Sequence, residues 1–416
     1  MNVKIKNAPL CGEVTVPPSK SAAHRALICA ALANGTSRVT PYCTSQDIMA
    51  TVDCLRALGL SVSEDQNGYT VGGGNPNKTA TLNFCESGST ARFLLPVAAA
   101  LGVNATATGS GRLPNRPMGI LTNLLREHGV EVSADNLPLT LNGKMTSGEF
   151  SLPGNVSSQY ISGLMLAAPL MEGATKINLT TAAESVGYID MTINALKNQG
   201  VNLLATNNGW EIPENSSLKA KDVVIEGDWS QAAFFMSAAA IGSEVRIKGL
   251  NFASCQGDMA ALDVFAAFGA DIHIEDNTLI VKKGTLRGIE VNASNIPDMV
   301  PAIAATAAYA NGKTIIHSAE RLRIKESDRI KTTIAALNAM GVKTEEKPDG
   351  MIIYPSGKVN GGKINGANDH RIVMAFSVAA AFANGESEIY GAEAINKSYR
   401  EFFTDFKKLG GSVNEI

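Results

Sequence analysis

The chain has 416 residues, of which 45% are hydrophobic and 18% charged, and its formal net charge is −3. This length is two to three times that of an average domain, so more than one hydrophobic core is expected. The nearly neutral charge argues against a nucleic-acid or membrane-surface binder held by bulk charge. Any anion that the protein binds must therefore meet a local cluster of cations.

Targeting and redox signals are weak. The longest apolar runs, 299–310 and 372–383, are shorter than the roughly 20 residues of a membrane helix. The N-terminal segment MNVKIKNAPL lacks the apolar core of a signal peptide. The six cysteines contain no Cys-x-x-Cys pair, and the five histidines show no metal-ligand spacing. We expect a cytoplasmic protein with reduced, buried thiols, with no metal site and with no nucleic-acid or membrane partner.

Six alanine-rich helical segments that end in glycine recur along the chain. In order they are 21–35, 90–102, 159–173, 231–242, 298–312 and 370–385. Each precedes a β-type run and then a second amphipathic helix, which stops at Gly59, Gly129, Gly200, Gly269, Gly341 or Gly410. Both sets of glycines recur about every 70 residues. The pattern predicts six α/β units, each with a helix, a strand, a helix and further strands.

Two breaks divide these repeats into equal halves. Pro17-Pro18-Ser19 precedes the first repeat, and Glu226-Gly227-Asp228 separates the third from the fourth. We expect one domain over residues 18–226 and a second made of residues 1–17 and 227–416. In this arrangement the N-terminal strand crosses over to complete the second domain, and the two crossings form a hinge.

Polar residues open the first helix of each repeat. They read PPSKSAAHR (17–25), CESGSTAR (85–92), GNVSSQY (154–160), GDWSQAA (227–233), NIPDMVP (295–301) and GANDHR (366–371). Ser, Asp and Asn are ordinary caps at such positions. Cations are not, because the helix dipole opposes positive charge there unless an anion is bound. The cations in the first two turns are Lys20, His24, Arg25, Arg92, His370 and Arg371.

The first motif, PSKSAAHR, has the spacing of an oxyanion clamp. Helical periodicity places Lys20 beside His24 and Ser21 beside Arg25, so we expect four donors on one side of the first turn. Ordinary capping by the serines is the alternative for this motif taken alone.

The second motif, SGSTAR, has small residues that let backbone N–H groups approach a ligand. Arg92 follows Ser89 by three residues, on the same helix face. Arg112 and Arg116 lie downstream in the Gly/Pro-rich stretch GSGRLPNRP. For that stretch a solvated loop and a ligand-binding loop are both open.

The densest charge lies in ERLRIKESDR, residues 320–329. Arg321, Arg323 and Lys325 alternate as on one side of a strand, and Glu326, Asp328 and Arg329 are then expected to enter a helix. A solvated face with ion pairs is one interpretation. Because cations are concentrated at corresponding ends of both halves, we favour a cleft for a multiply anionic ligand. A carboxylate and a lysine beside such a site can act as general base and acid.

Eight motifs in one order resemble the 5-enolpyruvylshikimate-3-phosphate synthases of the enolpyruvyl transferase family. They are PSKSAAHR, SGSTAR, RLPNRPM, VSSQY, IPDM, RIKESDR, NDHR and NKSY, and the likeness runs nearly end to end. The resemblance implies an α/β fold of two similar domains, each with three βαβαββ repeats in an inside-out barrel-like arrangement. It implies domains that close over small-molecule substrates around a two-strand hinge, in a protein expected to be a monomer.

The implied reaction transfers the enolpyruvyl group of phosphoenolpyruvate to the 5-hydroxyl of shikimate 3-phosphate and releases phosphate, without a cofactor, in aromatic amino acid biosynthesis. By the resemblance, shikimate 3-phosphate is held by Lys20, Ser21, Arg25, Ser157, Ser158, Gln159, Ser185, Tyr188, Asp298 and Lys325. Phosphoenolpyruvate is held by Lys20, Gly88, Arg92, Arg116, Gln159, Arg329, Arg371 and Lys397. The herbicide glyphosate is expected to occupy the same site.

The resemblance also assigns the proton transfers. Asp298 takes the proton of the attacking hydroxyl, and Lys325 with Glu326 serves the methylene carbon. Lys20 and Lys397 complete the catalytic set.

The sequence departs from the family pattern at three positions. Glu86 and Arg321 stand where asparagine is common, and Phe93 stands where many members have proline. Each of these departures affects a local contact.

Two other functions stay open. One is the sister transferase, whose acceptor is a UDP-linked amino sugar, but Ser21 stands where those enzymes typically have asparagine and residues 108–118 contain no cysteine. The other is a non-catalytic scaffold for a phosphorylated metabolite, which would not need Asp298 and Glu326 beside Lys325.

Overall fold

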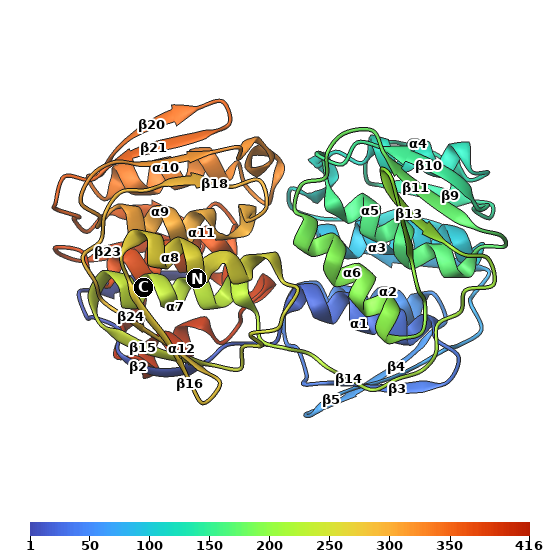
Figure 1. The fold of residues 1–416 in the computed structure, drawn as a ribbon, viewed down its shortest axis with the longest axis horizontal. Helices are drawn as coiled ribbons and strands as arrows, with labels where there is room; N and C mark the ends of the chain where they lie inside the picture. Colours follow the sequence, from blue (N-terminus) through green and yellow to red (C-terminus); the bar gives the residue numbers. More distant parts are fainter. The chain divides into compact units, whose positions relative to one another are not determined.

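The computed structural model describes all 416 residues, which divide into two compact units. The N unit contains Pro18–Ile225, and the C unit contains Met1–Pro17 together with Glu226–Ile416. Each unit has its own buried apolar core. Figure 1 shows that each unit is built from helices and small sheets.

The N unit contains three repeats. Its helices are α1 (Lys20–Leu32), α2 (Gln46–Ala57), α3 (Gly88–Leu101), α4 (Gly119–Glu127), α5 (Ser158–Ala167) and α6 (Val186–Asn198), with short 3-10 helices η1 (Leu113–Asn115) and η2 (Ala168–Leu170). Its strands are β3 (Thr36–Thr40), β4 (Ser61–Asp65), β5 (Gly68–Gly72), β6 (Thr79–Asn83), β7 (Asn104–Thr108), β8 (Glu131–Val132), β9 (Leu139–Asn142), β10 (Gly148–Leu152), β11 (Thr175–Leu179), β12 (Leu204–Thr206), β13 (Gly209–Ile212) and β14 (Val223–Val224).

The C unit contains the other three repeats. Its helices are α7 (Trp229–Gly242), α8 (Ala261–Phe268), α9 (Val300–Ala307), α10 (Arg329–Ala339), α11 (His370–Ala380) and α12 (Phe402–Lys408), with 3-10 helices η3 (Gly257–Ala260), η4 (Pro297–Met299), η5 (Glu320–Ile324) and η6 (Ala392–Lys397). Its strands are β1 (Asn2–Lys6), β2 (Gly12–Thr15), β15 (Glu244–Lys248), β16 (Asp271–Glu275), β17 (Thr278–Lys282), β18 (Glu290–Asn292), β19 (Thr314–His317), β20 (Lys343–Lys347), β21 (Gly350–Tyr354), β22 (Lys363–Asn365), β23 (Ser387–Tyr390) and β24 (Ser412–Glu415).

All six sheets have four strands and the same pattern of directions. In the order β6-β7-β9-β8, the first pair is parallel, with Thr79 opposite Asn104, and the next two pairs are antiparallel. The parallel pair is joined by the first helix of the repeat, here α3, as a parallel connection requires. Six copies of this pattern confirm the predicted α/β repeats.

Strands from distant parts of the chain complete three sheets. In the C unit, β2 pairs in parallel with β15, and β1 lies between β23 and β24. In the N unit, β14 pairs in parallel with β3. The N-terminal strands therefore belong to sheets of the C unit.

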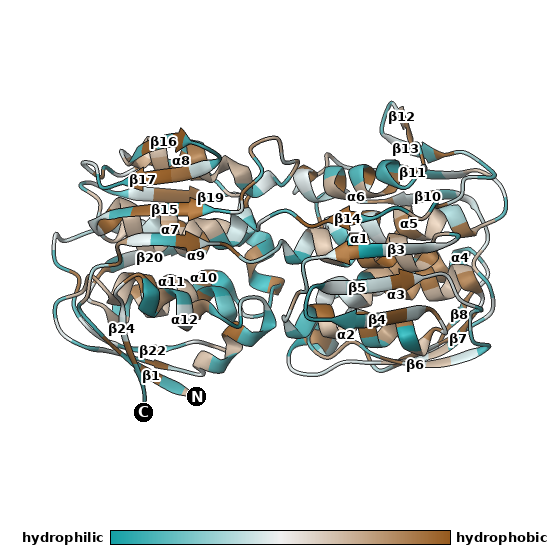
Figure 2. Ribbon diagram, turned by 90° about the horizontal axis from the view of Figure 1, so that it is seen from below, coloured by the Kyte–Doolittle hydropathy of each residue, from teal (hydrophilic) through white to brown (hydrophobic).

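The first helices of the repeats lie inside each unit and the sheets lie outside, as Figure 1 shows for α9 and α11. These helices are buried nearly all round because they are rich in alanine; in α7 every residue from Trp229 to Ile241 is buried. An added Cβ at Gly163 of α5 would collide with the carbonyl oxygen of Arg92 in α3, so glycine permits this close packing. Figure 2 shows the apolar colours gathered on such central helices, for example α3.

The second helix of each repeat ends one or two residues before its predicted glycine, whereas α1, α5, α9 and α11 end three to six residues before theirs. Where glycine does end a helix, the reason is physical. Gly102 ends α3 with φ 72° and Gly269 ends α8 with φ 104°, both in the left-handed region that glycine adopts without strain. No helix is long and apolar enough to cross a membrane.

The predicted strand over residues 321–325 is wrong. The segment forms the 3-10 helix η5, and the helix that follows begins only at Arg329, with Asp328 as its cap. The neighbouring strand β19 is already paired on both sides, by β18 and β21, so no sheet edge is open to this segment. Arg323 instead donates to the carbonyl oxygens of Pro348 and Lys347.

The expectation of buried thiols holds only in part. Cys29, Cys43 and Cys54 are buried, whereas Cys11 and Cys85 are exposed. Cys85 lies in the turn that leads into α3, outside the packed helices.

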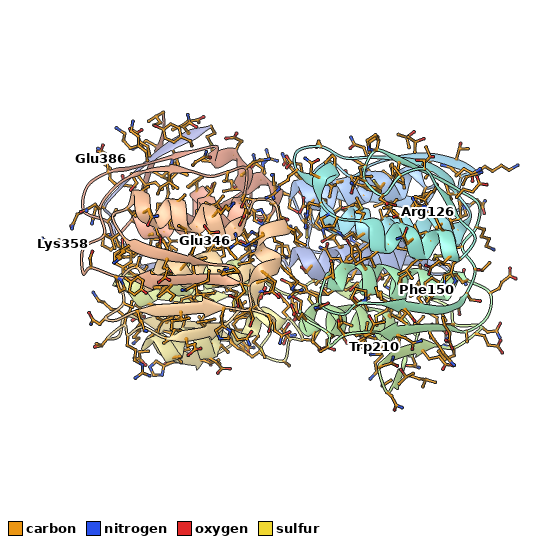
Figure 3. All side chains as sticks on the ribbon, turned by 90° about the horizontal axis from the view of Figure 1, so that it is seen from above. Arg126, Phe150, Trp210, Glu346, Lys358 and Glu386 are labelled. Atoms are coloured by element: carbon orange, nitrogen blue, oxygen red, sulfur yellow. The ribbon has the colours of Figure 1, made fainter.

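Exposed ion pairs occupy the outside of each unit. Arg126, labelled in Figure 3, pairs with Asp135 at 2.6 Å. Glu346, also labelled there, pairs with Arg323 at 2.8 Å. Pairs exposed to this extent contribute little to stability.

Candidate active site

Serine side chains cap the helices that carry the predicted ligands of the N unit. Ser19, Ser87 and Ser157 accept hydrogen bonds from the first turns of α1, α3 and α5. Each cap leaves further N–H groups of its turn pointing outward, at the positive end of the helix dipole. Because α1, α3 and α5 are the first helices of three equivalent repeats, their N-termini occupy the same position in each repeat.

Arg92 joins α3 to α5. Its Nη1 donates to Gln159 Oε1 at 2.8 Å, and Gln159 Nε2 donates to Ser89 Oγ at 2.9 Å. The guanidinium also lies 5.6 Å from the ring centroid of Tyr160. Two residues predicted to bind phosphoenolpyruvate, Arg92 and Gln159, are therefore joined with Ser89 in one network.

Two guanidinium groups converge on Gly88, the first residue of α3. An added Cβ there would lie 2.6 Å from Arg116 Nη1 and 2.7 Å from Arg92 Nη1. Both arginines are buried. Two cations at a helix N-terminus create a strongly positive location that favours a bound anion. Arg116 thus belongs to the candidate site, whereas Glu86 lies against Gly111 in the preceding turn.

The four donors of PSKSAAHR do not share one side, contrary to the sequence analysis. Lys20 and His24 face α2, where Lys20 Nζ lies 2.5 Å from Asp47 Oδ2. Arg25 turns the other way, and its Nε donates to Thr192 Oγ1 of α6 at 2.7 Å. The four positions fall on two faces of α1 because residues one apart differ by about 100° on a helix.

His24 is not a cation of the site. It is fully buried, its Nδ1 lies 2.7 Å from Thr51 Oγ1, and burial, with Lys20 and Arg25 nearby, holds its pKa well below 6.5. The imidazole is therefore neutral and belongs to the core, which corrects its inclusion among the cations.

Arg25 holds helices together. Besides Thr192, it donates to the carbonyl oxygens of Ser21 at 2.7 Å and Tyr188 at 2.8 Å. Its guanidinium lies 4.9 Å from the ring centroid of Phe93, the residue that departs from the family pattern. Phe93 therefore packs on Arg25.

The remaining predicted ligands of the N unit open α5 and α6. Ser158 is buried in the first turn of α5, and Ser185 is buried with φ 53° at the cap of α6. Tyr188 lies in the first turn of α6. These positions agree with the expected location of a ligand at helix N-termini.

In the C unit, Asp298 meets three cations. Its carboxylate lies 3.3 Å from Lys325 Nζ, 2.8 Å from Arg329 Nη1 and 3.1 Å from Arg371 Nη2. Arg371 also donates to the Asp298 carbonyl oxygen at 3.0 Å. The predicted base, the predicted lysine acid and two predicted phosphoenolpyruvate ligands thus lie in one cluster.

Arg329 is the centre of this cluster. It is 1% exposed and donates to Glu326 at 2.7 Å and to Asp369 at 2.8 Å, in addition to Asp298. Burial lowers the pKa of its guanidinium, but the three carboxylates outweigh burial and raise the pKa overall. The guanidinium is therefore permanently charged and fixes the two carboxylates that were assigned to proton transfer.

Lys397 ends η6, beside the start of α11. Its Nζ donates to the Asn368 carbonyl oxygen at 2.6 Å, and the lysine is buried. Asp369, the cap of α11, accepts from Arg371 N and from Ser327 Oγ. This places the NDHR and NKSY motifs at one helix N-terminus.

Three acidic residues of these clusters were missed by sequence reasoning. Asp47 and Asp369 were taken for caps or passed over, and only their contacts with Lys20 and Arg329 distinguish them. Asp258 is buried in η3 and is bonded by the Ser230 hydroxyl. Burial and the nearby Asp298 raise the pKa of Asp258 to about 6. No local pattern marks it.

The arrangement supports acid–base chemistry on an anionic substrate. A carboxylate that contacts a lysine can accept a proton while the ammonium donates one. Nowhere do three or more His, Cys, Asp or Glu side chains group as metal ligands would.

The fold is that of the enolpyruvyl transferases. An EPSP synthase from Acinetobacter baumannii matches with a TM-score of 0.84 and 27% identity, covering 100% of both chains. The enolpyruvyl transferase NikO from Streptomyces tendae matches with a TM-score of 0.82 at 19% identity, covering 99% of this chain and 98% of that one. The predicted fold class is confirmed by these structures.

The family follows from the sequence comparisons. The model of the family "EPSP synthase (3-phosphoshikimate 1-carboxyvinyltransferase)" matches residues 5–406. A 3-phosphoshikimate 1-carboxyvinyltransferase from Clostridium novyi is 40% identical over 430 residues, covering 100% of this chain and 98% of the relative. One from Clostridium kluyveri is 39% identical, covering 99% and 98%. The chain belongs to the EPSP synthase family.

Proposed function

We propose that the protein transfers the enolpyruvyl group of phosphoenolpyruvate to the 5-hydroxyl of shikimate 3-phosphate, releasing phosphate. The observation that supports this most is the contact of Asp298 with Lys325 at 3.3 Å inside a cluster of arginines. A base, an acid and fixed cations are the groups that this reaction needs. Family membership supplies the substrates.

Each substrate carries a phosphate and a carboxylate, so together they present four anionic groups. We assign shikimate 3-phosphate to Lys20, Ser21, Arg25, Ser157, Ser158, Gln159, Ser185, Tyr188, Asp298 and Lys325. We assign phosphoenolpyruvate to Lys20, Gly88, Arg92, Arg116, Gln159, Arg329, Arg371 and Lys397. Arginine is suited to this task because its planar guanidinium binds carboxylate and phosphate through two parallel hydrogen bonds.

The first chemical step is an addition. Asp298 accepts the proton of the 5-hydroxyl group while the hydroxyl oxygen bonds to C2 of phosphoenolpyruvate. A proton from Lys325 or Glu326 goes to C3. The product is a tetrahedral adduct with a methyl group and an intact phosphate. Arg329 keeps Asp298 and Glu326 in place, since it bonds both.

The second step is an elimination. The C2–O bond to phosphate breaks, and a proton leaves the C3 methyl group for the base that supplied it. The carbon–carbon double bond is restored, and inorganic phosphate departs with the proton that Asp298 accepted in the addition, which regenerates the carboxylate. The cations stabilise the charge of the leaving phosphate. All atoms and electrons balance without an oxidant or a cofactor.

The two alternative functions fit less well. A UDP-sugar acceptor is disfavoured by the family match over residues 5–406 and by Ser21. A non-catalytic scaffold would not require a carboxylate placed 3.3 Å from a lysine. We further propose that the enzyme is a monomer, which sedimentation of the purified protein tests. We also propose that it acts in the cytoplasm.

Phosphorus and carbon NMR test the reaction itself. With phosphoenolpyruvate labelled by ¹³C at C2 and unlabelled shikimate 3-phosphate, we expect the label to move into a vinyl ether as inorganic phosphate appears in equal amount. Label in free pyruvate would instead show hydrolysis and would contradict the proposal.

A further inference from the structure

Asp47 lies in the first turn of α2 and contacts a proposed substrate ligand. Its Oδ2 is 2.5 Å from Lys20 Nζ, and the two side chains are 12% and 16% exposed. An ion pair hidden to this extent is screened less by salt than a surface pair. The carboxylate therefore restricts where the Lys20 ammonium can lie.

The backbone of the same residue reaches α3. Thr90 Oγ1 donates to the Asp47 carbonyl oxygen at 3.3 Å and shares a hydrogen bond of 2.7 Å with Ser87 Oγ, the cap of α3. Thr90 is fully buried and lies two residues after Gly88. The first turn of α2 is thus bonded to the start of α3, where Arg92 and Arg116 converge.

A third connection returns to α1. Thr51, one turn after Asp47, shares a hydrogen bond of 2.7 Å with Thr90 and another of 2.7 Å with His24, which lies one turn after Lys20. Thr51 and His24 are fully buried. These hydrogen bonds connect the start of α1 to the start of α3 through α2.

We propose that Asp47 is a positioning residue of the transfer reaction, holding the Lys20 ammonium in register with the Gly88 end of α3. The proposal rests on the proposed function, in which Lys20 contacts both substrates. The carboxylate orients the ammonium before substrates arrive. Asp47 itself need not touch either substrate.

Helix capping does not explain this placement. The cap of α2 is Ser45, whose hydroxyl accepts from Ile48 N at 3.4 Å. An acidic side chain in the first turn also interacts favourably with the helix dipole, but it would do so equally well on the exposed side of the turn. The Asp47 side chain instead contacts Lys20.

Kinetics of Asp47→Asn test the proposal. We expect kcat/KM for phosphoenolpyruvate to fall at least about tenfold, since a misplaced group costs rate. Asp47→Glu should recover part of the loss because it restores the charge. The matched control is Asp53→Asn on the same helix, whose carboxylate pairs with Arg56 at 3.4 Å and is 67% exposed. It should match wild type.

A double-mutant cycle tests the mechanism. If Asp47 acts through Lys20, the double variant Lys20→Ala/Asp47→Asn should lie within about threefold of Lys20→Ala alone. Losses that multiply, or an Asp47→Asn variant equal to Asp53→Asn, would overturn the proposal.

A readout without turnover separates this from the proposed function. Labelling of resting protein with trinitrobenzenesulfonate, followed by peptide mass mapping, should show faster modification of Lys20 in Asp47→Asn than in wild type. Equal labelling would overturn the proposal even in an active enzyme. Faster labelling in a protein with no transferase activity would support the Asp47–Lys20 link and reject the proposed function.

Discussion

Arg329 bonds Asp298 at 2.8 Å while remaining 1% exposed, so the proposed catalytic base is held by a cation that solvent does not reach. The same guanidinium bonds Glu326 and Asp369. Three segments of the chain, at residues 298, 326–329 and 369, meet at this one side chain. In the proposed reaction, the geometry of proton transfer therefore depends on Arg329.

Replacing Arg329 by lysine tests this dependence. A lysine cannot span three carboxylates, so buried charge is left uncompensated and we expect a loss of about 3 kcal/mol in the free energy of unfolding. Catalysis should fall at least about 100-fold, because the base and acid lose their alignment. Urea unfolding and steady-state kinetics measure both. The exposed Lys331→Gln on the same helix is the control, and retention of half the activity in Arg329→Lys would contradict the account.

Asp298→Asn should fold but lose turnover. The amide has the shape of the carboxylate yet cannot accept a proton, and the loss of one acid–base group typically costs 10²–10⁴-fold in kcat. The comparison variant is Asp263→Asn on the exposed face of α8. Activity above about a tenth of wild type, well outside that typical loss, would show that Asp298 is not the base.

Gly88→Ala should weaken phosphoenolpyruvate binding without unfolding the protein. The new methyl group would meet the ends of the Arg92 and Arg116 side chains at 2.7 and 2.6 Å, and these flexible ends can shift. We expect KM for phosphoenolpyruvate to rise and the inhibition constant of glyphosate to rise further.

Gly119→Ala is the matched control for this prediction. Gly119 also opens a helix, α4, but its added Cβ would meet Asp135 only at 3.9 Å, an ordinary contact. If the two alanine variants have the same KM and the same glyphosate inhibition constant, Gly88 does not line the phosphoenolpyruvate site.

The buried carboxyl of Asp258 predicts a specific pH dependence of stability. Burial raises its pKa from 3.8 to about 6, so the folded state favours the protonated form. This contribution to stability is present below pH 3.8 and is lost as pH rises through about 6. Asp258→Asn should therefore gain up to about 3 kcal/mol relative to wild type at pH 7, and the gain should shrink toward pH 4. Urea unfolding between pH 4 and 7 measures this gain. A gain in the free energy of unfolding that grew on acidification would contradict the prediction.

Much of the fold could be predicted because each repeat carries local signals. Alanine-rich helices, serine caps and glycines such as Gly102, which needs φ 72°, are readable from short stretches. The strand expected at 321–325 was wrong because alternation cannot show that β19 lacks an open edge. His24 was taken for a cation because spacing does not show which side of α1 faces the core.

The site could be predicted residue by residue only where motifs match the family. The partners of Asp298 come from segments 27 to 73 residues away in sequence, and no local pattern encodes such convergence. Asp47 and Asp258 could not be predicted for the same reason. Their roles depend on a neighbour brought close by folding, which becomes visible only in three dimensions.

Phosphate release from phosphoenolpyruvate, measured with three choices of acceptor, tests the central claim most directly. The purified protein is given shikimate 3-phosphate, a UDP-linked amino sugar, or no acceptor. The account predicts release with shikimate 3-phosphate alone, abolished by Asp298→Asn. Release with the UDP-sugar, or equal release with and without an acceptor, would contradict it.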